Sequence, residues 1–288
     1  MNLPVVNTDL ESSPERSWRA RLELAFRAGR ERTVMTHAAH EGPLRVQRLF
    51  YPEAGGKAHC YLLHPPGGVV LGDALEVDVS VASGSVLLTT PSAGRFYSGR
   101  GFFEEQLQRV RLRADGGILE WLPQETILFA GARARLHTSI ELAAEAQLAY
   151  WDVLVLGRPA CGEAFDSGLC EQRLDIRRDG RPLYLDRLDL RAGDRLSRAR
   201  LGLNGASTVG LAAFTHRATD ALVERWRHTA AAMDPAGAFS ITQRGELLLA
   251  RYLGEDAQRC RAAFSILWRD LGHEREGRSP VEPRIWHT

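Results

Sequence analysis

The sequence predicts a mainly β protein of many short strands, with two α-helices in the last third of the chain. Apolar and polar residues alternate with period two in much of residues 18–190, and glycine-rich turn signals separate these runs. After about residue 219 the apolar spacing changes to three and four residues, which is the helical pattern. Many short strands without intervening helices are typical of a sandwich, a barrel or a β-helix, and composition does not choose among the three.

Several strands can be placed from the alternation alone. Residues 22–26 alternate apolar and charged side chains, and residues 75–81 do so more cleanly. Residues 86–90 and 136–142 predict two further strands. Asp179-Gly180 lies between two apolar runs, and this dipeptide predicts a hairpin with a two-residue turn.

The two helices are expected at about residues 219–233 and 255–271. Thr219 and Asp220 can cap the first helix, and Asp234-Pro235 ends it. Its apolar face consists of Leu222, Val223, Trp226, Ala230 and Met233. The second helix carries apolar residues at the same spacing, and Gly272 is expected to follow its last turn as the C′ residue.

Composition excludes several classes of protein. The 288 residues include 37 Lys and Arg and 36 Asp and Glu, and the net charge of +1 argues against nucleic-acid binding or a polybasic membrane surface. No apolar stretch approaches the roughly 20 residues that a spanning helix needs. Residues 1–16 lack the pattern of a signal peptide and are expected to form a disordered tail before one domain over residues 17–288. We therefore expect a cytoplasmic protein.

Common catalytic and metal-binding motifs are missing from the sequence. GxxxxGK[ST] and GxGxxG do not occur, so the chain is not expected to hydrolyse nucleotides by itself. His37 and His40 suit a metal only on a helix, and the sequence around them resembles strand and loop. The cysteines form no CxxC pair or zinc spacing and are expected to be buried free thiols: Cys60, Cys161, Cys170 and Cys260.

The most informative segment is residues 119–127, which place two carboxylates in an otherwise apolar run. Glu120 and Glu125 are costly to bury unless they are paired, hydrogen-bonded or bound to a cation. Pro123 lies between them and argues against one long regular strand. The acids could tie loops together, offer oxygen ligands to a cation, or form the acid pair of a glycosidase on neighbouring strands.

Three further acids lie in polar or glycine-rich surroundings. Asp73 follows the loop at residues 64–68, where a rigid turn with Asp73 bound to backbone amides is favoured over a ligand surface. Asp152 follows Trp151 and precedes an apolar run, so partial burial is expected. Glu163 lies two residues after Cys161, a spacing that suits Ni²⁺ or Zn²⁺, although pairing of Glu163 with Arg158 is the favoured alternative.

Taken together, these segments resemble the UreD family of urease accessory proteins, also called UreH. The resemblance runs from residues 42–48 to residues 283–286. It is carried by residues 61–70, 88–91, 119–127, 157–159 with 162–163, and the closing Pro-Arg-Ile-Trp. Several motifs in the right order are more specific than any one of them. The resemblance implies a β-helix-like body with two helices and a protein that is not an enzyme.

The family's role supplies an expectation for the acids. Its members act with the UreF protein and the GTPase UreG to deliver nickel to apo-urease, and a route for nickel through the interior has been proposed for the family. A conduit needs ligands that replace water without trapping the ion, which scattered carboxylates do better than a closed cage. The candidate ligands for transient Ni²⁺ are Asp73, Glu120, Glu125, Asp152 and Glu163. No tightly bound cofactor is expected, and a Cys161 thiolate would slow release.

Two other functions stay open at the level of sequence. One is a β-helical carbohydrate-active enzyme that uses paired carboxylates. The other is a plain β scaffold without metal traffic, in which the acids hydrogen-bond to turns. Nickel binding that depends on the carboxylates would separate the conduit from the scaffold.

Overall fold

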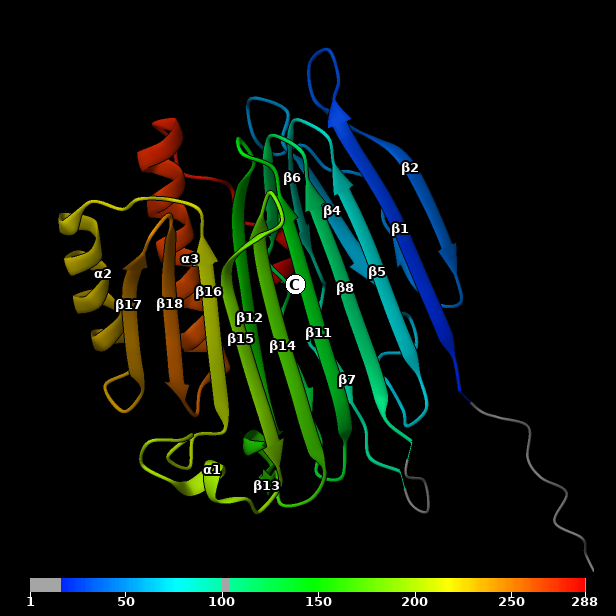
Figure 1. The fold of residues 1–288 in the computed structure, drawn as a ribbon, viewed down its shortest axis with the longest axis vertical. Coiled ribbons are helices and arrows are strands. Elements are labelled where there is room, and N and C mark those ends of the chain that lie inside the picture. The colour runs from blue at the N-terminus through cyan, green and yellow to red at the C-terminus, as the bar shows by residue number, and fades with distance from the viewer. Residues whose placement is uncertain (1–16, 100–103, 288) are drawn as a thin grey trace, which may run out of the picture.

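The computed structural model describes residues 17–99 and 104–287, and it places two large β-sheets face to face with helices behind one of them (Figure 1). The predicted mainly β architecture is confirmed. The predicted tail at residues 1–16 lies outside the described residues. Among the described helices, none combines the length and the apolar character that crossing a membrane requires.

The front sheet has seven strands. Across the sheet they are β15 (Arg181–Arg191), β14 (Leu169–Arg178), β11 (Arg133–Leu142), β8 (Gln106–Ala114), β5 (Ala74–Val81), β1 (Arg19–Ala28) and β2 (Thr33–Glu41). The five central strands are parallel, and only the outermost pairs β1–β2 and β14–β15 are antiparallel.

The rear sheet has eleven strands. Its main path is β17 (Ala238–Arg244), β18 (Leu247–Gly254), β16 (Thr208–Phe214), β12 (Gln147–Arg158), β9 (Ile118–Trp121), β6 (Ser85–Thr89), β4 (Ala58–Leu63) and β3 (Arg45–Val46). Three short strands join it beside this path: β7 (Gly94–Phe96), β10 (Thr126–Leu128) and β13 (Glu163–Ala164).

Successive strands of the central body alternate between the two sheets, so the chain coils as in a β-helix. From β4 to β6, β9 and β12, each rear strand lies parallel to the next, and front strands intervene in the sequence. Side chains therefore stack in ladders between the sheets, as Leu22, Val77 and Val110 do on three neighbouring strands. These ladders form the main core and explain why the period-two pattern predicted the strands well.

The predicted hairpin is confirmed at β14–β15. Asp179 and Gly180 both have positive φ, +47° and +74°, which a two-residue turn between twisted strands requires. His37 and His40 lie on strand β2, which confirms the strand assignment there.

The helices α2 (Asp220–Met233) and α3 (Ala257–Glu276) pack behind the rear sheet (Figure 1). The first agrees with its predicted span, and the Thr219 hydroxyl accepts a hydrogen bond from the Leu222 N–H as its N-cap. The structure also has three short helical turns: η1 (Pro159–Cys161), α1 (Arg195–Arg198) and η2 (Arg284–His287).

The predicted end of α3 at Gly272 is wrong. The helix continues to Glu276, and Gly277 with φ +69° is the capping glycine. Gly272 lies inside the helix, and the Pro280 ring packs against it where a side chain would otherwise be. A Cβ at position 272 would come within 2.4 Å of Pro280 Cδ. The glycine thus serves a tertiary contact that helix periodicity does not reveal.

The prediction of four buried thiols holds for three of them. Cys60, Cys170 and Cys260 are buried and free, and burial raises the pKa of the Cys60 thiol to about 12. Cys161 is exposed because η1 carries it beyond the end of β12.

Candidate functional site

A cavity of about 310 Å³ lies between the two sheets and is called here the inner cavity. Segments 62–69, 90–96 and 121–126 contribute to its lining, and Asp152 adds a carboxylate. The three segments follow β4, β6 and β9, which are neighbouring parallel strands of the rear sheet. Because parallel strands end on the same side of a sheet, the coil gathers segments that are far apart in sequence around one space.

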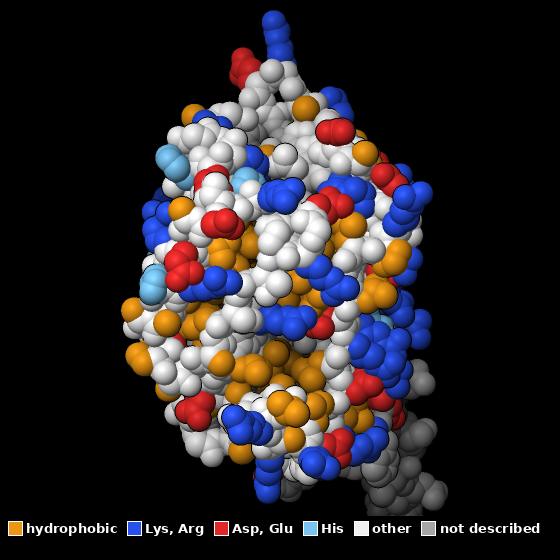
Figure 2. All heavy atoms as spheres, turned by 60° about the vertical axis from the view of Figure 1, so that its left-hand side comes forward, with side chains coloured by type: hydrophobic (Ala, Val, Ile, Leu, Met, Phe, Trp, Pro, Cys, Tyr) orange, Lys and Arg blue, Asp and Glu red, His pale blue; other side chains and the backbone are white. Residues whose placement is uncertain are grey.

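A second hollow of about 490 Å³, the side groove, lies between the β14–β15 hairpin and strands β16, β17 and β18. Figure 2 shows this side of the molecule, where hydrophobic side chains line hollows between charged ones. Tyr150, Asp152 and Gln172 line the groove. Asp152 therefore borders both the inner cavity and the side groove.

Strand β12 points Asp152 into the space between the sheets. Its alternate neighbours Tyr150 and Leu154 belong to the core between the sheets, which fixes the direction of the Asp152 side chain. Its Oδ2 accepts a hydrogen bond from Gln172 Nε2 at 2.6 Å and a longer one from the Tyr150 hydroxyl at 3.4 Å.

Burial raises the pKa of the Asp152 carboxyl above its ordinary value, and the bonds from Gln172 and Tyr150 oppose that rise. Within residues 17–99 and 104–287, no Lys, Arg or His forms an ion pair with Asp152. This carboxylate thus has polar neighbours but lacks a compensating cation among the described residues.

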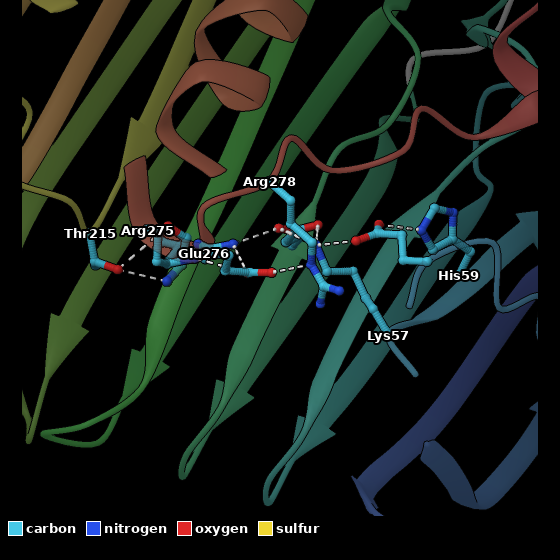
Figure 3. A network of polar contacts seen from close by, with 9 residues as sticks. Lys57, His59, Thr215, Arg275, Glu276 and Arg278 are labelled. Atoms are coloured by element: carbon cyan, nitrogen blue, oxygen red, sulfur yellow. Dashed lines mark hydrogen bonds and ion pairs between the residues drawn. The ribbon is translucent and has the colours of Figure 1, made fainter. Parts of the chain in front are cut away.

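Glu120 faces the opposite side of the same sheet. Leu119 and Trp121 point into the core, so Glu120 points toward α3. It is fully buried, with Lys57 Nζ 3.1 Å and Arg275 Nη2 3.6 Å from its Oε1. Lys57 also pairs with Glu53, which in turn contacts His59 (Figure 3). Glu120 is therefore one member of a buried ionic network that ties α3 to the rear sheet.

Glu125 lies at a third place, in an open groove of about 1080 Å³ called here the end groove. Its Oε2 is 2.7 Å from Arg261 Nε on α3. The Cys161 side chain also lines this groove.

Glu163 lies in the strand that follows η1 and is bound on both carboxylate oxygens. It accepts a hydrogen bond from the Ala130 N–H at 2.9 Å and an ionic one from Arg158 Nε at 2.7 Å. The Arg158 guanidinium lowers the pKa of Glu163. The pairing of Glu163 with Arg158, favoured from sequence, is present in the structure.

Asp73 closes the loop that follows β4. Its two carboxylate oxygens accept hydrogen bonds from the Trp18 N–H at 2.8 Å and the Val70 N–H at 3.0 Å. This is the turn-stabilising arrangement favoured from sequence. The nearby His64 lines the inner cavity, and burial lowers its pKa while Asp73 opposes that shift.

The five predicted acids do not converge on one site. In the part of the chain that the structure describes, no group of three or more His, Cys, Asp and Glu side chains could hold a metal ion. Glu120 and Glu125 are the pair considered for a glycosidase. Each is bound by a different arginine of α3, and only Glu125 of the two lines the end groove. The arrangement offers a single carboxylate within a cavity rather than a cage or an acid pair.

Sequence reasoning missed the polar partners of Asp152. Gln172, which donates to Asp152, lies on β14 of the front sheet and lines the side groove. The inner cavity has further polar lining residues that were also missed: Gln108, Gln124 and Thr138. None of them carries a local signal. An amide or hydroxyl among strand residues becomes informative only after the coil shows which residues of the two sheets face each other.

The fold and the site define a class: a coiled two-sheet body with a carboxylate-bearing interior cavity. Comparison with known proteins then gives the family. The sequence profile of "UreD urease accessory protein" matches residues 19–287. Two relatives named "Urease accessory protein UreD" align over nearly the whole chain. That of Saccharophagus degradans is 40% identical over 291 residues, covering 99% of both chains, and that of Pseudomonas fluorescens is 41% identical over 290 residues, covering 100% of both.

A third relative with the same name, from Klebsiella aerogenes, is 40% identical over 275 residues, which cover 95% of this chain and 98% of the relative. The chain belongs to the UreD family of urease accessory proteins. Its relatives are named as accessory proteins and not as enzymes.

Proposed function

We propose that this protein is a non-enzymatic, cytoplasmic maturation factor that passes Ni²⁺ through its interior to apo-urease. The supporting observation is the position of Asp152. It borders both the inner cavity and the side groove, and it has no cationic partner among the described residues. A carboxylate left in this state is the group that a passing divalent cation would compensate.

The surroundings of Asp152 suit transit better than storage. One carboxylate, the Gln172 amide and the Tyr150 hydroxyl can replace part of the hydration shell of a cation. They cannot supply the several nitrogen or sulfur ligands of a tight transition-metal site. The ion would therefore exchange its ligands and leave, which conduction requires.

The remaining candidate acids differ in what they support. Glu120 pairs with Lys57 and Glu163 pairs with Arg158, while both oxygens of Asp73 accept hydrogen bonds from backbone N–H groups. These partners favour structural roles. Glu125 lines the end groove beside Arg261, and its nickel role stays a prediction.

The proposed partners are a UreF-type accessory protein, a UreG-type GTPase and apo-urease itself. The chain contains no GxxxxGK[ST] motif, so a partner would have to supply any nucleotide hydrolysis. This protein would then act as the chaperone and bridge, with nickel as cargo rather than as a resident cofactor.

A second candidate is a scaffold that assembles the maturation complex without carrying nickel. It is favoured by the number of acids bound within the protein, with Glu120 in its ionic network as the clearest case. Under that proposal the inner cavity would be a packing defect, and Asp152 could be neutralised without effect on urease.

The experiment that tests maturation is urease activation in cells that lack this gene, with and without added nickel. We expect inactive, nickel-poor urease without the gene, and recovery when the gene is restored. Full urease activity without the gene at ordinary nickel levels would overturn the proposed function.

A further inference from the structure

The strand β2 forms an open edge of the front sheet (Figure 1). Among the described residues it pairs only with β1. Its residues from Thr36 to Glu41 are exposed although side chains of a strand alternate between two faces. The backbone of Thr33 is bound by Gly56 and Tyr51, but beyond it the outer row of N–H and C=O groups of β2 is a template for another strand.

The two edges of the front sheet differ in how they are protected. β15 carries Pro182 and five charged residues: Arg181, Asp186, Arg187, Asp189 and Arg191. Such residues oppose pairing with a further strand. In contrast, residues 34–39 of β2 include no lysine, arginine, acid or proline. The sequence thus protects β15 more heavily than β2, whose pairing with β1 has one register shift at Thr36 and is regular from His37 to Glu41.

The inner face of β2 also lacks a cover. Leu22 and Leu24 of β1 are buried, while their cross-strand partners His40 and Ala38 are exposed. The rear sheet ends on this side with the two-residue strand β3 beside β4, so β2 extends beyond the core. An added strand would continue the sheet and shield this uncovered ribbon.

We propose that β2 pairs with β2 of a second copy of this chain, antiparallel about a two-fold axis. A two-fold interface uses the same surface on both copies, and an edge strand is complementary to itself in its backbone groups. In the register centred on Ala39, each His37, which lies 3.6 Å from Glu23 of its own chain, also faces Glu41 of the second copy, so two such pairs form by symmetry. This interface is independent of the proposed role in nickel delivery.

The first test is sedimentation equilibrium of the purified full chain over a range of concentrations. We expect a monomer–dimer equilibrium. The double variant Ala38→Lys/Ala39→Lys should raise the dimer Kd at least about tenfold, because it puts like charges into the pairing edge. Leu185→Lys is the matched control, since Leu185 is an exposed residue of the protected edge β15. It should leave the equilibrium unchanged.

The second test is cross-linking in a Cys161→Ser background, which removes the exposed native thiol. In the proposed register Ala39 lies opposite Ala39 of the second copy, within the Cα separation that a disulfide spans. Ala39→Cys should therefore form a covalent dimer under mild oxidation much faster than Leu185→Cys.

Three outcomes would overturn the proposal. If the wild type stays monomeric at every concentration, the edge does not pair with a second copy, and a strand of another protein becomes the alternative partner. A dimer that survives the two lysines would use another surface. Equal cross-linking of the two cysteine variants would exclude the register centred on Ala39.

Discussion

Glu120 and Asp152 lie on β9 and β12, two neighbouring parallel strands of the rear sheet, yet their surroundings are opposite. Glu120 points outward and is held by Lys57 and Arg275, with helix α3 packed over it. Asp152 points inward to a cavity, and the side chains that donate to it among the described residues are the uncharged Gln172 and Tyr150. One sheet thus separates a carboxylate that holds the fold together from one that is available to a cation.

The difference follows from the alternation of side chains along a strand. The outer face of the rear sheet receives α3, whose arginines compensate acids on that face. The inner face receives only the front sheet, which offers Gln172 opposite Asp152. Burial alone therefore does not distinguish these two acids, whereas the presence of a neighbouring cationic side chain does.

The largest expected effect on stability is at Glu120, the acid that points outward. Glu120→Ala should lower the free energy of unfolding by about 3–5 kcal/mol, because it takes from the buried Lys57 the nearer of its two carboxylate partners and leaves Glu53 at 3.5 Å. Urea denaturation measures the change. The exposed-site variant Glu224→Ala is the control.

A companion variant separates the charge from the packing. Lys57→Met/Glu120→Leu removes both charges and should recover part of that stability, since Arg275 keeps Glu276 at 2.8 Å while Glu53 keeps His59 at 3.0 Å but loses Lys57. A loss of less than about 1 kcal/mol for Glu120→Ala would show that the network does not stabilise the fold.

On the inward side, the raised pKa of Asp152 predicts that stability depends on pH. Burial raises the pKa of Asp152, so the folded protein keeps this proton to a higher pH than the unfolded chain does. The stability from the protonated carboxyl is complete below its ordinary pKa of 3.8 and is lost as the pH rises through the raised pKa. Asp152→Asn removes this loss.

Stability curves of the wild type and Asp152→Asn between about pH 4 and pH 7 check this prediction. As the pH rises, the free energy of unfolding of the variant should increase relative to that of the wild type, by on the order of 1 kcal/mol for each pH unit between the ordinary and the raised pKa. A constant difference across the range would mean that Asp152 finds full compensation in the folded state.

The smallest effect is expected at Glu163. This carboxylate is paired with a largely exposed arginine at the surface, so solvent screens the interaction. Glu163→Gln keeps an acceptor for the Ala130 N–H and should unfold close to the wild type in urea. Urease activation should also be unaffected. A strong loss of urease nickel with this variant would return Glu163 to the nickel path.

The local pattern of the sequence predicted the elements but not the partners. Alternation at residues 75–81 was enough for β5, and Asp179-Gly180 was enough for the hairpin. Lys57 and Glu120 meet only because β4, β6 and β9 lie side by side in the coil. Likewise, the prediction that Gly272 ends α3 was wrong, because a glycine is needed there for the contact with Pro280. These contacts depend on the order of strands in space, which periodicity does not contain.

The candidate site shows the same division. The unusual acids were visible as polar residues in apolar or glycine-rich segments, and Asp152 was among them. The distinction between Asp152 and Glu120 required the direction of each side chain and the position of α3. That information belongs to tertiary packing.

The most direct test of the account is the nickel content of urease matured in cells that carry Asp152→Asn in place of the wild type. Asp186→Asn is the matched control, because Asp186 also lines the side groove but lies 3.8 Å from Arg251. With equal protein levels and normal assembly with urease, Asp152→Asn should lower the nickel content at least about tenfold, as expected for loss of one charged contact of a few kcal/mol. The control should load urease normally. Full nickel loading with Asp152→Asn would contradict a path through this interior.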